Sequence, residues 1–144
     1  MTRDPHWPAR LEEYLRSSQQ TKFRHGSFDC ALFVASAILA MTGTDIAESF
    51  RNAYRTRQQA IQRSKELGLG ASIQSLTEGV AALYSLPEVP PLCASRGDMV
   101  LIPRAKGRDH SLGIVALNGR EIYWALRVGW GTLPLSRACR AWRI

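Results

Sequence analysis

Cys30 is the residue best placed to do chemistry, because it stands where a loop meets a long apolar segment. Residues 30–41 are almost all apolar or small, which predicts a helix that other elements surround. Ser27 or Asp29 can cap its start, and Gly43 follows its end. A cysteine in the first turn of a helix meets a dipole that favours the nucleophilic thiolate. The alternative is that Cys30 is a small core residue, since free cysteines are often buried.

The two other cysteines, Cys93 and Cys139, do not extend this site. Three cysteines are an odd number and show no CxxC spacing, so we expect neither a disulfide framework nor a zinc site. We expect no metal and no cofactor.

The composition is that of one soluble globular domain, which we assign to residues 1–144. Hydrophobic residues make up 45% and charged residues 22% of a chain long enough for a substantial core. The longest apolar run, 31–41, is too short to span a bilayer. The N-terminus shows no apolar signal segment, so we expect synthesis and folding in a reducing cytoplasm.

The net charge is +7, and the basic residues are scattered along the chain. A basic surface can attract nucleic acid, an anionic cell-wall polymer or an acidic protein. No nucleic-acid-binding motif accompanies the charge, so nucleic acid is not the expected partner. The alternatives are a solvated basic surface and a protein partner.

The first part of the chain is predicted to be helical. An apolar stripe at helical spacing predicts a first helix over 7–17, with Asp4-Pro5 as its cap and first-turn proline. After the central helix, further helical stretches are predicted over 45–54, 56–67 and 72–83, with Asp45 and Ser72 as caps of the first and last.

The last third changes to the two-residue period of strands. Asn118-Gly119 is a strong signal for a two-residue hairpin, and Gly129-Trp130-Gly131 is predicted to be a turn. Helices followed by an antiparallel sheet make the expected fold α+β, with N-terminal helices packed on a C-terminal sheet. The predicted strands are 99–102, 111–117, 121–126 and 139–144.

The order of these motifs resembles the NlpC-type papain-like cysteine peptidases, and the resemblance covers the chain from Phe23 onward. It implies a papain-like NlpC-type fold. The main matching pieces are Phe28-Asp29-Cys30-Ala31-Leu32-Phe33, Arg96-Gly97-Asp98-Met99-Val100-Leu101, Leu112-Gly113-Ile114-Val115 and the Asn-Gly hairpin. Further pieces resemble the small NlpC-like proteins of bacteriophage and gene-transfer-agent tail modules, namely Gly26, Thr42-Gly43-Thr44-Asp45, Tyr54-Arg55-Thr56, Pro134-Leu135 and Ala141-Trp142-Arg143.

The resemblance implies a mechanism in which a helix-start cysteine attacks an amide and a strand histidine takes its proton. It puts Cys30 at the nucleophile position and Asp29 at the residue before it. The position of the base falls on Ser111, and His110 is one residue earlier. Because strand side chains alternate between faces, we expect His110 to point away unless a bulge restores its direction. The other interpretation makes His110 a solvent-facing turn residue beside Asp109.

Two further positions bear on this site. His25 stands where active relatives often have an aromatic residue, so it either lies by Cys30 or is an exposed loop residue. The family's third residue, which orients the base, has no His, Asn or Gln here. The following strand offers Glu121 and Tyr123, and Tyr123 either accepts a hydrogen bond or packs beside Trp124.

The resemblance leaves two functions open. In the first, the chain is a structural or assembly component of a phage tail tip or hub, with a degenerate catalytic site. Its partners are then other tail proteins, and its location is the virion tail and, during assembly, the host cytoplasm. Its contacts would use the basic surface and three aromatic candidates, Trp7, Trp130 and Trp142.

In the second, the chain is an active cysteine peptidase or amidase that cleaves peptidoglycan stem peptides during genome delivery. Cys30 is then the nucleophile, and His110 or His25 is the base. The missing strand histidine favours the first function, and the intact Phe28-Asp29-Cys30 favours the second.

Overall fold

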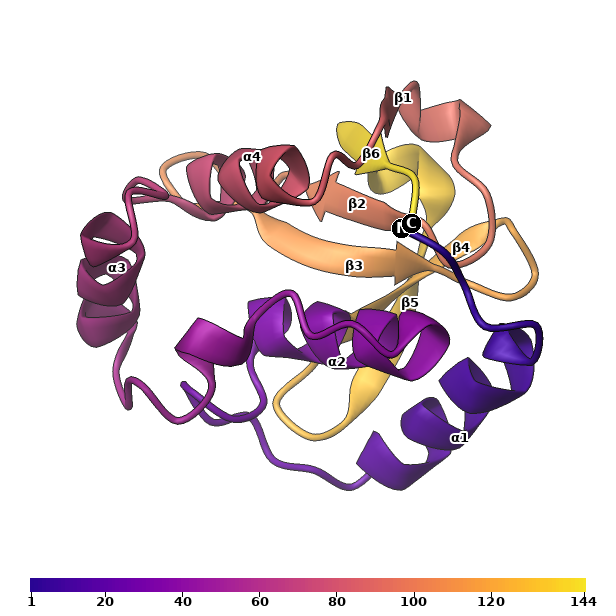
Figure 1. Cartoon of the computed structure of the whole chain (residues 1–144), viewed down its shortest axis with the longest axis horizontal. Coiled ribbons are helices and arrows are strands. Elements are labelled where there is room, and N and C mark those ends of the chain that lie inside the picture. Colours follow the sequence, from indigo (N-terminus) through magenta and orange to yellow (C-terminus); the bar gives the residue numbers. More distant parts are fainter.

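Four α-helices precede all six strands along the chain (Figure 1). This computed structural model describes residues 1–144. The helices are α1 (Trp7–Ser18), α2 (Cys30–Thr42), α3 (Arg57–Glu66) and α4 (Ile73–Leu83), with short 3-10 turns η1 (Glu48–Phe50), η2 (Pro91–Cys93) and η3 (Leu135–Arg137). The strands are β1 (Glu88–Val89), β2 (Met99–Ile102), β3 (Ser111–Val115), β4 (Glu121–Ala125), β5 (Trp130–Pro134) and β6 (Arg140–Trp142). The predicted α+β class is confirmed.

All six strands form one antiparallel sheet in the order β1-β6-β2-β3-β4-β5. Every residue of β2 and β3 is buried, so these central strands are covered on both faces. The helices pack on one face, and the segments around η2 and η3 pack on the other. This two-sided burial explains why β2 reads as a continuous apolar run rather than as an alternating one.

Helix α2 lies across the sheet, between the strands and α1 (Figure 1). Its apolar character on nearly all sides is what this central position requires. Gly43 ends the helix with a φ of 75°, a left-handed conformation that glycine adopts without steric cost. None of the helices has both the length and the hydropathy that a membrane crossing requires. The main core joins α1, α2 and the sheet through Leu11, Leu15, Phe33, Ala37, Ile38, Met41, Leu101, Leu112 and Ile114.

Two predictions about helix starts are wrong. Helix α1 begins with His6 at its cap and a proline in its first turn, whereas the Asp4 carboxylate accepts a hydrogen bond from the His6 N–H before the helix. Over 45–54 only the η1 turn forms. The Asp45 carboxylate there bonds to the Ala47 N–H and to the Arg51 guanidinium, so it stabilises a turn instead of a helix.

The strand predictions need three corrections. Trp130 and Gly131 begin β5 and do not form a turn, because both pair with β4. The hairpin at Asn118-Gly119 is longer than two residues, since the Ala116 N–H donates to the Glu121 carbonyl across it. Strand β1 was not predicted, and the strands predicted over 111–117 and 139–144 are shorter than expected.

The fully buried Asp98 carboxylate ties both chain ends to the start of β2. It accepts hydrogen bonds from Arg3 Nη2 at 2.6 Å, from the Ser95 N–H at 2.8 Å and from the Ile144 N–H at 3.3 Å. The two ends of the chain accordingly lie side by side (Figure 1). Removal of a buried carboxylate that has three donors is costly, because it leaves the cation, here Arg3, without a counter-charge.

We expect Asp98→Ala to lower the free energy of unfolding by about 3 to 5 kcal/mol, because the partly buried Arg3 loses its counter-charge and two backbone N–H groups lose their acceptor. The matched control is Glu66→Ala, which removes an exposed ion pair with Arg63 and should cost under about 1 kcal/mol. Urea unfolding of both variants tests this prediction. Equal costs would contradict it.

Candidate active site

Cys30 is the first residue of α2, and Asp29 fixes the helix start. The Asp29 backbone is extended, and its side chain accepts a hydrogen bond from the Leu32 N–H at 3.0 Å. This N-cap satisfies one of the free amides of the first turn. Of the two predicted caps, Ser27 and Asp29, the structure uses Asp29.

The Asp29 carboxylate is buried and holds two further groups. It accepts a hydrogen bond from the Gly26 N–H at 3.1 Å and another from the Tyr54 hydroxyl at 2.5 Å. Burial first, and the neighbouring Asp29 charge second, raise the pKa of Tyr54, so this hydroxyl remains a donor. The carboxylate therefore connects the loop before Cys30, the start of α2 and the segment after η1 by hydrogen bonds.

Gly26 makes the close approach of this loop possible. Its φ is +86°, and a Cβ built on it would lie 1.9 Å from the Tyr54 carbonyl oxygen. The Gly26 carbonyl in turn accepts a hydrogen bond from the Asn52 N–H at 2.7 Å. No other residue type combines this φ with this contact.

The Cys30 thiol lies near Ser111 and Leu112 at the start of β3. Strand β4 leaves this part of β3 unpaired, since it pairs with β3 only from Ile114 onward. Burial, followed by the Asp29 charge, raises the pKa of Cys30 to about 11. Hydrogen bonding from the Leu112 N–H and the Ser111 hydroxyl lowers the pKa of Cys30, but by less than burial and the Asp29 charge raise it. Burial and the Asp29 charge therefore favour the neutral thiol over the thiolate that the helix dipole favours.

All four residues predicted for the site, Cys30, Asp29, His25 and His110, line one cavity of about 180 Å³. His25 is partly buried, and its ring meets the edge of Phe23 with ring centroids 5.2 Å apart. No hydrogen bond joins the Cys30 sulfur to either histidine. The structure thus brings the predicted residues together without forming a cysteine–histidine pair.

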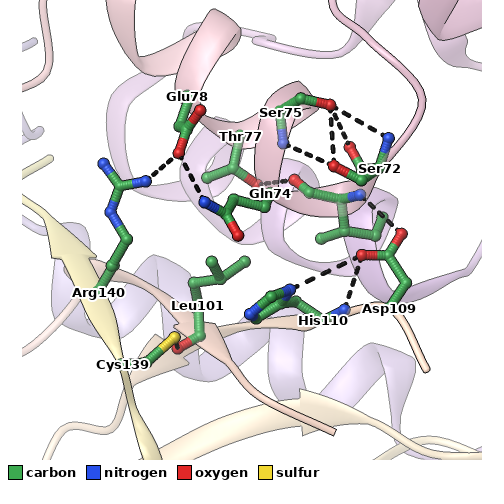
Figure 2. A network of polar contacts seen from close by, with 11 residues as sticks. Ser72, Gln74, Ser75, Thr77, Glu78, Leu101, Asp109, His110, Cys139 and Arg140 are labelled. Carbon is green, nitrogen blue, oxygen red and sulfur yellow. Dashed lines mark hydrogen bonds and ion pairs between the residues drawn. The ribbon is translucent and has the colours of Figure 1, made fainter. Parts of the chain in front are cut away.

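His110 lies beside Asp109 at the start of β3 (Figure 2). Its Nδ1 is 3.8 Å from Asp109 Oδ1, and its own N–H donates to the same oxygen at 2.7 Å. The other Asp109 oxygen accepts a hydrogen bond from the Ile73 N–H at 2.8 Å, which fixes the β3 start to the first turn of α4. Asp109 was predicted only as the neighbour of His110 in a turn. An acid next to a histidine is nevertheless a usable sequence signal for a carboxylate that orients the imidazole.

Ser111 stands at the position where the resemblance to NlpC-type peptidases puts the catalytic base. Ser111 pairs with Ile102, and the next pair, Leu101 with Leu112, faces the helices. No bulge interrupts this register, yet His110 lines the helix-side cavity. The His110 side chain is 29% exposed and lies beside Asp109 while it also lines the cavity.

No group on β4 orients a base. Tyr123 packs against Trp130 with ring centroids 5.1 Å apart, and its hydroxyl accepts a long hydrogen bond from the Leu117 N–H. Glu121 accepts a hydrogen bond from the Asn118 side chain in the hairpin. No group of three or more His, Cys, Asp or Glu side chains is placed to hold a metal ion.

We expect Gly26→Ala to cost more than about 3 kcal/mol of stability, because the methyl group would overlap the Tyr54 carbonyl at a strained φ. Gly43→Ala is the matched control. Gly43 also has a positive φ, but nothing lies within 4 Å of its added Cβ, so the cost should be about 1 kcal/mol. Chemical unfolding that gives the two variants the same stability would contradict this account of the loop.

We expect iodoacetamide at neutral pH to modify Cys30 at least roughly tenfold more slowly than the exposed Cys93, because Cys30 is only partly exposed and the pKa of its thiol is raised. Mass spectrometry of timed digests measures both rates in one sample. In urea the two rates should become equal. Preferential modification of Cys30 in the folded chain would refute the neutral-thiol assignment.

Comparison with solved structures supports the fold. The crystal structure of the NlpC/p60 domain of the peptidoglycan hydrolase SagA matches with a TM-score of 0.57 over 95% of this chain and 98% of that chain. The sequence identity is 15%, so this likeness establishes an NlpC/p60-like fold. No curated protein matches the sequence. The family described as "Domain of unknown function (DUF6950)" matches residues 2–144, and the chain belongs to this family.

Proposed function

We propose that this chain is a structural or assembly component of a bacteriophage tail tip or hub that uses an NlpC/p60-type scaffold without hydrolysing peptidoglycan. The observation that carries the loss of catalysis is that the Cys30 sulfur has no hydrogen-bonded histidine, and burial, which raises the pKa of its thiol, acts in the same direction. A nucleophile without an oriented base loses most of its rate advantage.

The tail context rests on the sequence resemblance to small NlpC-like proteins of phage tail modules. In this proposal the partners are neighbouring tail-tip or hub proteins. The protein would be in the host cytoplasm during assembly and in the virion tail afterwards. A net charge of +7 suits partners with acidic surfaces.

The aromatic contacts must be reassigned. Trp142 is only 3% exposed and belongs to the core, so its predicted role as a surface anchor is wrong. Trp7 packs under the Arg3 guanidinium, and the Trp130 Nε1–H donates to the Leu15 carbonyl at 2.7 Å. All three tryptophans therefore have internal structural contacts.

A better contact surface surrounds Phe23, where two segments of the chain meet. The Phe23 N–H donates to the Arg127 carbonyl, and Lys22 bridges to Val128. Phe23, Leu126 and Val128 are 39%, 38% and 49% exposed. Exposed apolar side chains flanked by cations fit an acidic partner with an apolar centre. The flanking cations are Lys22, Arg24 and Arg127.

One observation favours the alternative, a cysteine peptidase or amidase acting on peptidoglycan stem peptides. Cys30, His25 and His110 line the same cavity, and catalytic hydrogen bonds can be long in a protein without substrate. Asp109 would then orient His110.

In a phage whose tail contains this protein, as the proposal requires, we expect Cys30→Ala to leave tails complete and infectivity unchanged, because in this proposal the sulfur performs no chemistry. Plaque counts and electron microscopy of particles measure both. A phage with intact tails that fails to infect would reject the structural role in favour of hydrolysis.

We expect Val128→Glu to prevent incorporation of the protein into tails, because it places a charge in the apolar centre of the contact surface. Leu92→Glu is the matched control, since Leu92 is 75% exposed on η2, outside this surface. Immunoblots of purified particles test both variants. Normal incorporation of Val128→Glu would remove this surface from the proposal.

A further inference from the structure

The two edges of the sheet differ in how they are protected. Strand β1 forms one edge and is only two residues long. Two prolines follow it, and its Glu88 carboxylate is paired with Arg140. Short, charged strands next to proline are a common way to keep an edge from pairing with another chain. Strand β5 forms the other edge, is five residues long and contains no charged residue, so it lacks this protection.

The hydrogen bonds between β4 and β5 show which backbone groups of β5 point outward. The Leu126 N–H donates to the Gly129 carbonyl at one end of this strand pair, and the Leu135 N–H donates to the Arg120 carbonyl at the other. In an antiparallel pair, residues that bond across the pair alternate with residues that point away from it. In this register the odd-numbered residues of 129–135 therefore bond to β4. The even-numbered residues direct their backbone groups away from the sheet.

The outward groups belong to Trp130, Thr132 and Pro134. The backbone N–H and C=O of Trp130 and of Thr132 form no hydrogen bond with any segment on the outer side of β5. Thr132 is exposed, and Trp130 is half-buried. Pro134 ends the row of donors, because proline has no N–H. Trp130 and Thr132 thus form an open edge with unpaired donors and acceptors.

This chain already occupies the neighbouring part of the same edge. Residues 21–23 lie as a short antiparallel strand beside residues 127–129, with hydrogen bonds of 2.8 Å donated by the Phe23 N–H and by the Gly129 N–H. Before residue 21 the chain belongs to the end of α1, so this short strand does not continue along Trp130. The open edge therefore lies in line with a segment that shows how a further strand can pair.

The surroundings of the open edge are cationic. Exposed basic residues lie in the segments next to both of its ends, and none of them forms an ion pair. The only acid of β4, Glu121, accepts a hydrogen bond from the Asn118 side chain. A second copy of this chain would bring a net charge of +7 against these cations, whereas an acidic segment would complement them. The basic residues are Lys22 and Arg127 at the Trp130 end, and Arg120 and Arg137 at the Pro134 end.

We propose that the open edge of β5 binds an extended acidic segment of a partner protein, which adds to the sheet as a further strand. The backbone of the segment exchanges hydrogen bonds with the N–H and C=O groups of Trp130 and Thr132. Its acidic side chains lie near the cations at the two ends of the edge. The edge adjoins the contact surface around Phe23, but this binding requires neither the tail assignment nor any chemistry at Cys30.

The test titrates a capped peptide into the full chain and follows backbone amides by NMR. The peptide has two glutamates at each end, with valine, threonine and valine between them. We expect a Kd of about 1 mM or lower, with slower hydrogen exchange at the Trp130 and Thr132 amides. No binding at this concentration, or binding that leaves both amides unchanged, would overturn the proposal.

Two control peptides separate charge from strand pairing. A peptide with lysines in place of the glutamates should bind at least roughly tenfold more weakly, because the edge is flanked by cations. A peptide that keeps the glutamates but has N-methylated central residues should also bind at least roughly tenfold more weakly, because it lacks the backbone donors for pairing. Equal binding of the first control would overturn the acidic class of partner, and equal binding of the second would overturn strand addition.

A matched pair of variants tests the edge itself. Thr132→Pro removes an outward N–H, a position at which an edge strand tolerates proline, and should weaken the glutamate peptide at least roughly tenfold. Thr132→Val keeps the N–H and should bind like the unmodified chain. Thermal unfolding midpoints establish that both variants fold, and if Thr132→Pro does not fold, the N-methylated peptide decides the question. Protection of the Thr132 amide that rises with protein concentration alone would show a second copy on the edge and overturn the proposal.

Discussion

The Asp29 carboxylate is the group on which the candidate site depends. One buried side chain caps α2, holds the Gly26 loop and receives the Tyr54 hydroxyl. The same charge lies beside Cys30 and helps to raise the pKa of the thiol. The interaction that positions the sulfur at the helix start therefore also keeps it protonated.

The second constraint is the register of β2 and β3. Ile102 pairs with Ser111 and Leu101 with Leu112 without interruption, and both Ser111 and Leu112 act on the Cys30 thiol. Ser111 lies where the family resemblance puts the base, and its hydroxyl can donate to the sulfur but cannot act as a base at neutral pH. His110 lies on the cavity side, where Asp109 is its nearest charged neighbour. A papain-like arrangement is thus present in outline, while its proton acceptor is displaced.

Much of the fold was predictable because its signals are local. The apolar segment 30–41, the caps at Asp29 and Ser72, and the run of β2 each follow from residue type and spacing. Predictions failed where a tertiary contact decided the outcome. Asp45 binds Arg51 and forms a turn.

The chemistry of the site was less predictable than its location. The helix dipole is worth about 1 kcal/mol, and desolvation of a buried thiol outweighs it. The sequence predicts the helix whose dipole acts on Cys30, but it does not predict how far packing removes the Cys30 thiol from water. The open edge of β5 was not predicted either, since Gly129-Trp130-Gly131 was expected to form a turn and only its pairing with β4 makes it a strand.

The most direct test of this account is the ionisation of Cys30 in the folded chain. Labelling the cysteine β-carbons and following the Cys30 signal by NMR from neutral to alkaline pH reports the thiol without a reagent, with Cys93 and Cys139 replaced by serine. The account predicts a single inflection near the pKa of about 11. An inflection below the free-thiol value of about 8.5, lost in His110→Ala or His25→Ala, would contradict it and identify a working cysteine–histidine pair.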